Sequence, residues 1–226
     1  MYLPARIRRP LKRAYYLALA PLYALVLNPL NRSRNAAKRE RRLEIGPGPR
    51  RIEGFETLNV VGGRDTDYVY DAAKRLPFAN GTFSLIYASH VLEHVPWYRV
   101  EECLKEWVRI LKPGGSIEIW VPDGLKIARC FVEAETNGSA EFQQDGWFRF
   151  NENHDPCLWA AGRFFSYGDG TGNKNDPNWH LAIFSPRYLK EAMERAGLVE
   201  VGVNERASVR GYDHGWINLG MKGRKP

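Results

Sequence analysis

The sequence is poor in cysteine and has neither long apolar runs nor internal repeats. Its three cysteines, Cys103, Cys130 and Cys157, have no C-x-x-C spacing and are too scattered for a disulfide framework. Their pattern excludes cysteine-held zinc modules and disulfide-stapled secreted domains, and it indicates a reducing, cytoplasmic compartment. No stretch reaches the ~20 apolar residues that a bilayer-spanning helix needs. With 226 residues and 44% hydrophobic content, the chain is expected to bury the core of a single domain.

Excess basic charge is absent from most of the chain and concentrated at its start. Residues 1–42 carry eleven Lys or Arg and one acid, a net +10, whereas the whole chain is +7 and residues 43–226 therefore sum to −3. A body without net positive charge has no basic groove that could follow a nucleic acid. We therefore expect no nucleic-acid partner.

Residues 1–41 are expected to form a basic and apolar N-terminal arm, followed by a folded body over 42–226. Residues 14–27 are rich in Leu, Ala and Tyr and are interrupted by Pro21. Basic flanks around such a segment favour an interfacial helix on an anionic leaflet, at the inner face of the membrane. A chain starting near Arg41 would then still fold. The alternative is an arm that packs on the body or on a partner subunit, so the oligomeric state, a dimer included, stays open.

The chain also lacks a complete dinucleotide-binding glycine pattern. Leu43-Glu44-Ile45-Gly46-Pro47-Gly48 is a short apolar strand with an acid, followed by a glycine turn. Such a turn lets the backbone approach a ligand, and a doubly wound sheet receives nucleotides this way. The acid precedes the glycines and no third glycine follows in register, which suits a cationic nucleoside better than a pyrophosphate. A strand that simply runs into a tight turn is the alternative.

Strands and helices alternate from residue 43 onwards. Residues 98–111 have the 3–4 apolar spacing of a helix, and a second helix over 186–196 ends at Gly197. Residues 112–115, Lys-Pro-Gly-Gly, predict a turn. Residues 138–180 have no clean period and are expected to form an aromatic-rich insertion over the sheet edge. Strands are expected over 42–45, 57–61, 67–70, 83–88, 116–121, 198–203 and 216–222.

Three segments in this order resemble class I S-adenosylmethionine-dependent methyltransferases. They are the glycine segment at 43–48, the run from Tyr-Asp-Ala-Ala to Leu-Glu-His-Val at 70–95, and Arg-Ile-Leu-Lys-Pro-Gly-Gly at 109–115. The most similar subgroup is the short bacterial methyltransferases associated with surface-polysaccharide biosynthesis. The resemblance implies an α/β fold with a Rossmann-like, seven-stranded, mostly parallel sheet. It also implies S-adenosyl-L-methionine as cofactor, bound at the carboxyl ends of the first strands.

The same resemblance implies roles for individual residues. Glu44 would engage the amino end of the cofactor, Asp71 would accept from the adenine amine, and the Ala72 amide would face the ring. Ser89 would lie beside the methionine part. The complete set of expected cofactor contacts is Glu44, Gly46, Pro47, Gly48, Asn59, Asp71, Ala72 and Ser89.

Two departures from the family pattern concern the second strand. The acid that usually ends this strand and binds the ribose hydroxyls would fall at Val61 and is therefore absent. Asn59, Asp65 or Asp67 is expected to substitute. In addition, the link between residues 48 and 57 is too short for an ordinary crossover helix. We expect a turn there.

Three histidines are candidates for the base that a hydroxyl acceptor requires. His90, Glu93 and His94 fall at i, i+3 and i+4, on one face if the segment is helical, and His180 is a further candidate. His-x-x-Glu-His also occurs in zinc proteases, but that interpretation needs a third ligand and a protease fold. Some methyltransferases also place a divalent cation at a comparable Glu-x-x-Glu-His, but here His90 would stand in place of the first Glu. No metal is therefore expected. In the alternative interpretation, His94 caps the short helix with Glu93 as its partner.

Aromatic residues and polar side chains are concentrated together over 147–180. Flat aromatic faces beside amides and carboxylates suit a sugar, although a core beneath a polar loop has the same composition. We therefore expect an O-methyltransferase whose acceptor is a sugar of a surface glycan or of its lipid-linked precursor. The alternatives are a small-molecule natural product as acceptor, and a non-catalytic binding protein with a methyltransferase fold.

Overall fold

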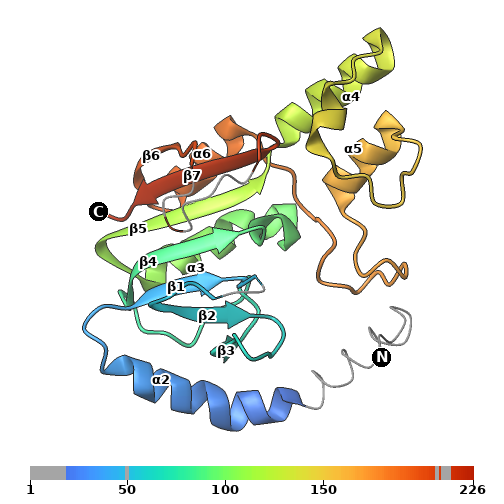
Figure 1. The fold of residues 1–226 in the computed structure, drawn as a ribbon. Helices are drawn as coiled ribbons and strands as arrows, with labels where there is room; N and C mark the ends of the chain where they lie inside the picture. Colours follow the sequence, from blue (N-terminus) through green and yellow to red (C-terminus); the bar gives the residue numbers. More distant parts are fainter. Residues whose placement is uncertain (1–18, 49–50, 207–208, 210–214) are drawn as a thin grey trace.

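A computed structural model describes residues 19–48, 51–206, 209 and 215–226 of the chain. Seven strands form one sheet in the order β3-β2-β1-β4-β5-β7-β6 (Figure 1). Neighbouring strands are parallel except that β7 runs antiparallel to β5 and to β6. The expected fold class, a seven-stranded and mostly parallel Rossmann-like sheet, is confirmed. The strands are β1 (Arg42–Ile45), β2 (Phe55–Asn59), β3 (Tyr68–Val69), β4 (Phe83–Ser89), β5 (Leu111–Pro122), β6 (Val199–Val203) and β7 (Asn218–Arg224).

The expected strands lie within a few residues of the observed ones, but the turn predicted at 112–115 is wrong. These residues belong to β5, whose pairing with β4 shifts register between Phe83 and Leu85. Gly114, at φ +72°, takes the left-handed conformation that this irregularity requires. Residues 112–115 are therefore an irregular stretch within β5.

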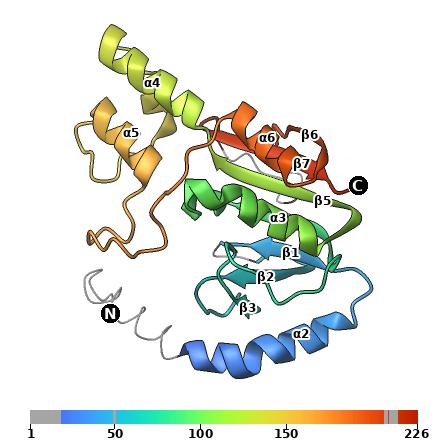
Figure 2. The ribbon, with the colours of Figure 1, turned by 180° about the vertical axis from the view of Figure 1, so that it is seen from behind.

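Helices α3 (Val100–Ile110) and α6 (Pro186–Arg195) cover one face of the sheet (Figure 2). Both were expected, because their apolar residues recur at 3–4 spacing and α6 is followed by Gly197 at φ +101°. Between β1 and β2, the described residues 51–54 form a turn rather than a helix, as predicted. The short segments η2 (Leu92–His94) and η3 (Trp97–Arg99) connect β4 to α3.

Two helices that the sequence analysis did not predict lie directly before the insertion over 138–180 and within it. Helix α4 (Gly124–Asn137) is capped by Asp123, and α5 (Pro156–Phe165) is capped by Asp155. With η4 (Glu141–Asp145), they pack beyond the end of the sheet around a second small core that includes Trp159 (Figure 1). Much of the aromatic content between residues 142 and 164 is thus core rather than ligand surface.

Residues 19–36 form a continuous helical stretch that comprises η1 (Tyr23–Leu27), a π-helical segment, and α2 (Asn28–Ala36). The amide of Asn28 donates to the carbonyl of Val69 at 3.2 Å and accepts from its N–H at 3.0 Å. Asn31 donates to the carbonyl of Asp67 at 2.8 Å. These asparagines satisfy the backbone of β3, which would otherwise be an open sheet edge. This part of the arm therefore packs on the body, which is the alternative stated above.

The π-helical turn sets the side of this helix that faces the body. Tyr23 and Asn28 are both buried although they are five residues apart, a spacing that an α-helix would place on different sides. Pro29 follows directly and lacks the N–H that a regular turn would use. The basic cluster before residue 14 and the first part of the expected interfacial segment lie outside the described residues. Among those described, no helix combines the length and apolarity needed to cross a bilayer.

Candidate active site

A cavity of about 1040 Å³ opens where the carboxyl ends of β1 to β4 meet. This is the switch point of the sheet, between β1 and β4, where α/β folds bind their ligands. The cavity has three walls: the strand ends and following loops, the loop over 166–178, and the N-terminal helix through Ala20 and Tyr23. Its volume is at the upper end of the range for small-molecule sites. It could hold a nucleoside together with an acceptor group.

The glycine turn after β1 admits no side chain at its first position. Gly46 has φ +72°, and a Cβ built there would lie 2.3 Å from Cγ2 of Val91. The backbone and Val91 therefore form a close-fitting wall that only glycine allows. Gly46 and Pro47 both line the cavity. A ligand in the cavity can therefore approach the backbone of this turn closely.

The eight expected cofactor residues divide into two groups. Gly46, Pro47, Asn59 and Ala72 line the cavity, whereas Glu44, Gly48, Asp71 and Ser89 are not among its lining residues. Glu44 is buried, and its carboxylate accepts from the N–H of Ile52 at 3.2 Å. Successive side chains of a strand point to opposite faces, so Glu44 lies on the other face of β1 from the cavity-lining Ile45. Asp71 is adjacent to Ala72, and its half-exposed carboxylate accepts from the N–H of Ala73 at 3.0 Å. Roles for these two acids at the cofactor stay predictions.

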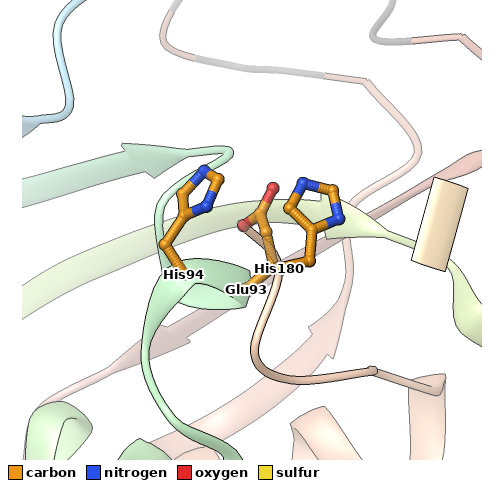
Figure 3. A group of neighbouring side chains, drawn as sticks. All are labelled: Glu93, His94 and His180. Atoms are coloured by element: carbon orange, nitrogen blue, oxygen red, sulfur yellow. The ribbon is translucent and has the colours of Figure 1, made fainter. Parts of the chain in front are cut away.

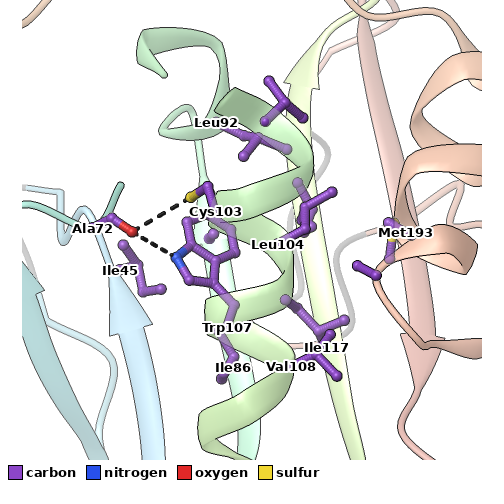
Figure 4. Close-up of a cluster of buried hydrophobic side chains, with 14 of the residues drawn as sticks. Ile45, Ala72, Ile86, Leu92, Cys103, Leu104, Trp107, Val108, Ile117 and Met193 are labelled. Carbon is purple, nitrogen blue, oxygen red and sulfur yellow. Dashed lines mark hydrogen bonds between the residues drawn. The ribbon is translucent and has the colours of Figure 1, made fainter. Parts of the chain in front are cut away.

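Ala72 is held in place from behind by α3. Its carbonyl accepts from Nε1 of Trp107 at 3.0 Å and from Sγ of Cys103 at 3.4 Å (Figure 4). Burial raises the pKa of the Cys103 thiol, so this sulfur stays protonated and acts as a donor. Two buried donors thereby fix the segment after β3 against the main core.

The second strand shows which residue could replace the missing ribose acid. Asn59 ends β2 and lines the cavity, as do Val60 and Val61. Asp67 instead accepts from the N–H of Thr57 at 3.0 Å and forms an ion pair with Arg51. Asp67 and Asp65 are not among the lining residues, so of the three expected substitutes only Asn59 is placed at the cavity.

His90 occupies a strained position at the end of β4. Its φ of +54° is uncommon for a side chain of this size, and its N–H donates to the carbonyl of Trp120 at 2.9 Å. The helical face expected for residues 90–94 is wrong, since η2 covers only Leu92–His94. The left-handed turn nevertheless brings Nδ1 of His90 to 3.0 Å from Oε1 of Glu93. His90 lines the cavity and Glu93 is buried beneath it.

Glu93, His94 and His180 converge beside this cavity (Figure 3). One ligand atom from each lies within 4.8 Å of the others, and the two imidazole ring centres are 5.1 Å apart. Nδ1 of His94 lies 3.1 Å from the carbonyl of Trp179, and Nδ1 of His180 lies 3.1 Å from that of Arg163. His94 therefore contacts a backbone carbonyl of the distant loop, and no side-chain capping bond is made at η2.

The charges in this cluster follow from burial and proximity. Burial acts to raise the pKa of Glu93, but the hydrogen bond from His90 and the nearby imidazoles outweigh it, so the net pKa is lowered. Burial lowers the pKa of His180, and Glu93 acts against that effect. Glu93 is thus a carboxylate and His180 a neutral imidazole.

The loop over 166–178 supplies the wall opposite the sheet. Asn173, Asn175, Asp176 and Asn178 line the cavity, and sugar binding by this loop stays a prediction. Among the aromatics proposed for that pocket, only Tyr167 lines it. Phe148, Trp159 and Phe164 belong instead to the second core, around which α4 and α5 pack.

The sequence analysis missed the N-terminal helix as a cavity wall. The hydroxyl of Tyr23 donates to the carbonyl of Gly63 at 3.0 Å and accepts from its N–H at 3.1 Å. A Cβ at Gly62 would lie 2.4 Å from the Tyr23 ring. A tyrosine among leucines and alanines gives no signal of such a role, but the Gly62-Gly63 pair after β2 indicates a close approach there.

Comparison with known proteins identifies a family that is similar to part of the chain. Residues 43–119 match the model of a family described as a methyltransferase domain. A search of proteins with curated descriptions found no match.

Several solved structures are similar to this chain at low sequence identity. One is the trans-methyltransferase CalH in complex with SAH, with 16% identity, coverage of 88% of this chain and 55% of that one, and a TM-score of 0.48. Another is a SAM-dependent methyltransferase of Methanosarcina mazei, with 14% identity, coverage of 85% and 96%, and a TM-score of 0.47. A third, from Thermotoga maritima, has 18% identity, coverage of 94% and 96%, and a TM-score of 0.40. The chain spans about half the length of CalH.

The family match includes β1 to β4, α3 and most of β5, and therefore the glycine turn and His90. The cavity lies at the carboxyl ends of the strands that this match includes. Residues 43–119, about a third of the chain, are thus similar to a methyltransferase domain, and this similarity supports S-adenosylmethionine as the cofactor.

Proposed function

We propose that the chain is an S-adenosylmethionine-dependent O-methyltransferase with His90 as its base. The observation that carries this proposal is the His90–Glu93 pair, which lies at the wall of the same cavity as the Gly46 turn. A buried carboxylate that holds Nδ1 of a strained, cavity-lining histidine is the arrangement of an oriented general base. His94 and His180 were the other two candidates. Their Nδ1 atoms contact backbone carbonyls, so no carboxylate orients them in this way.

The reaction requires positioning and removal of one proton. When bound, S-adenosylmethionine supplies a methyl group on a positively charged sulfur, which keeps the electron pair when the carbon–sulfur bond breaks. His90 would take the proton of the acceptor hydroxyl on Nε2, since Nδ1 is held by Glu93. The oxygen electron pair then forms the bond to the methyl carbon. Glu93 stabilises the resulting imidazolium, and the cavity walls hold the two reacting groups in line.

The proposed acceptor is a sugar hydroxyl of a surface glycan or of its lipid-linked precursor. The loop over 166–178 supports this choice because its lining side chains are amides and carboxylates, with Tyr167 as an aromatic face. Such groups bind hydroxyls by hydrogen bonds while a ring stacks on the sugar. A polar natural product is the second candidate acceptor, since it would use the same groups.

We further propose that the N-terminal arm holds the protein at the inner face of the membrane. On the helix over 19–36, Leu22, Leu25, Val26 and Leu30 are exposed, and Leu25 is 77% exposed. Together with the net charge of +10 over residues 1–42, this apolar face suits an anionic lipid surface. Full-length protein should co-sediment with vesicles containing anionic lipid at low salt, and be partly released at high salt. Replacing Leu25 and Leu30 by Ser should weaken binding; unchanged binding would contradict the proposal.

Calorimetry with S-adenosylmethionine and a radiolabelled methyl-transfer assay over a panel of sugar and small-molecule acceptors test the enzyme proposal. His90→Ala should lose turnover while it still binds cofactor, because the base acts on the acceptor. His154→Ala is the matched control, since this exposed histidine stacks on Phe148 away from the cavity. No heat of binding at millimolar cofactor would refute the enzyme and favour a binding protein. Wild-type turnover in His90→Ala would move the base to His94 or His180.

A further inference from the structure

We propose that Glu93, His94 and His180 form a site for a divalent transition-metal ion beside the cofactor cavity. The sequence analysis expected no metal, because the zinc-protease pattern needs a third ligand and a protease fold, and because His90 stands in place of the first Glu of the methyltransferase pattern. The fold brings in His180 from the distant loop before α6 (Figure 3). The site stands on geometry alone; only the role of the ion rests on the proposed function.

The first support is the tautomer that the backbone imposes on both imidazoles. The carbonyls of Trp179 and Arg163 can only accept, so Nδ1 of His94 and Nδ1 of His180 each carry a hydrogen. In a neutral ring Nε2 then has its lone pair available. Metal-binding histidines are oriented in this way, by donation of the other ring N–H to a carbonyl or carboxylate.

The second support is independent and comes from Glu93. Its side chain is 1% exposed, and Oε2 is buried with no hydrogen-bond partner among the residues that the structure describes. Oε1 is already occupied by His90 at 3.0 Å. An ionised carboxylate oxygen without a donor is costly at this depth. Two imidazoles that offer acceptor nitrogens cannot satisfy it, whereas a cation between the three groups satisfies all of them.

The donor set indicates which ions fit. Two imidazoles and one carboxylate match zinc and its first-row neighbours, whereas Mg²⁺ and Ca²⁺ prefer all-oxygen surroundings. Bonds of about 2.0–2.2 Å place tetrahedral ligands about 3.4 Å apart, so the ligand atoms, now within 4.8 Å, would draw together by side-chain rotation. Three protein ligands leave a position open for an acceptor oxygen. There the ion would stabilise the negative charge that develops as His90 takes the proton.

Titration of metal-depleted full-length protein with Co²⁺ alone, followed by visible absorption, tests the site without cofactor or acceptor. We expect one equivalent to bind with the bands of a low-coordinate Co²⁺, and Zn²⁺ to displace it. His180→Ala and Glu93→Gln should each weaken binding by about 100-fold or more, while His154→Ala should bind as wild type. Calorimetry with S-adenosylmethionine checks that each variant is folded.

A second variant identifies the ligand directly, even if alanine at 180 impairs folding. His180→Cys, made together with Cys157→Ser to remove the exposed thiol, should add an intense sulfur-to-cobalt band in the near ultraviolet. Absence of Co²⁺ binding at millimolar metal, binding that persists in His180→Ala, or a His180→Cys protein that binds Co²⁺ without the sulfur band would each overturn the site. Metal binding without methyl transfer would keep the site and refute only the proposed function.

Discussion

Replacing Gly46 by alanine should separate two costs that the glycine turn avoids. The first is conformational: alanine at φ +72° occupies the left-handed region, at about 1–2 kcal/mol. The second is steric: the new Cβ would lie 2.3 Å from Cγ2 of Val91, and overpacking of this kind costs about 1–3 kcal/mol. We therefore expect Gly46→Ala to lower the free energy of unfolding by about 2–5 kcal/mol. The shifted turn should also weaken cofactor binding at least tenfold, about 1.4 kcal/mol.

Two further variants separate the conformational cost from the steric cost. Gly54→Ala introduces the same left-handed strain at φ +78° with nothing within 4 Å of the new Cβ, so it should cost only the conformational part and leave cofactor affinity unchanged. Val91→Ala in the Gly46→Ala background removes the methyl group that clashes. The double variant should recover about 1–3 kcal/mol relative to additivity and much of the affinity.

Urea unfolding and calorimetry with S-adenosylmethionine measure the two quantities. The reasoning fails if Gly46→Ala binds cofactor as wild type, which would place the ligand away from this turn. It also fails if the double variant shows additive losses, since the contact with Val91 would then not be the cause.

Three other substitutions test residues in the cavity wall or next to it by the same calorimetry. Trp107→Phe removes the 3.0 Å hydrogen bond to the carbonyl of Ala72 and should cost about 0.5–1.5 kcal/mol of stability and a few-fold in cofactor affinity; an unchanged affinity would show that Ala72 needs no anchor. Tyr23→Phe removes both hydrogen bonds to Gly63 and should weaken cofactor binding, whereas an effect on stability alone would exclude the helix from the site. Asp71→Ala should weaken cofactor binding by about 1.5–3 kcal/mol, because a charge-assisted hydrogen-bond acceptor is lost. Wild-type affinity would show that Asp71 does not contact the cofactor and only stabilises the turn through the N–H of Ala73.

The sheet and the glycine turn could be predicted from sequence because their signals are local. Buried parallel strands are continuous apolar runs, and a glycine turn directly after the first of them marks the ligand-binding edge. The insertion was harder, because an aromatic residue has the same identity in a core as in a sugar site. Trp159 lies in the second core beside α4 and α5, whereas Tyr167 lines the cavity. Tertiary contacts, which the sequence pattern does not show, distinguish the two.

The N-terminal helix could not be predicted because its buried face is polar. Asn28 and Asn35 are buried, yet a hydrophobic pattern would place such residues in solvent. Asn28 is satisfied by the open edge of β3, and Asn35 donates to the hydroxyl of Tyr68 at 2.8 Å. Their burial depends on a partner strand more than thirty residues away in the chain. The apolar residues of the same helix face outward, the reverse of an ordinary amphipathic surface helix.

Residues 1–40 should therefore matter for folding as well as for location. Their removal would eliminate the hydrogen bond between Asn35 and the Tyr68 hydroxyl and the two hydrogen bonds between Asn28 and the backbone of Val69. The buried Glu56 would keep its hydrogen bonds from Arg41 and Tyr68. It would also open the cavity wall formed by Tyr23. These contacts of residues 19–36 favour the alternative in which the arm supports the folded body over the expectation that a chain starting near Arg41 still folds. Shortened protein should unfold at lower urea and bind S-adenosylmethionine more weakly, and equal stability and affinity would show that the arm serves location alone.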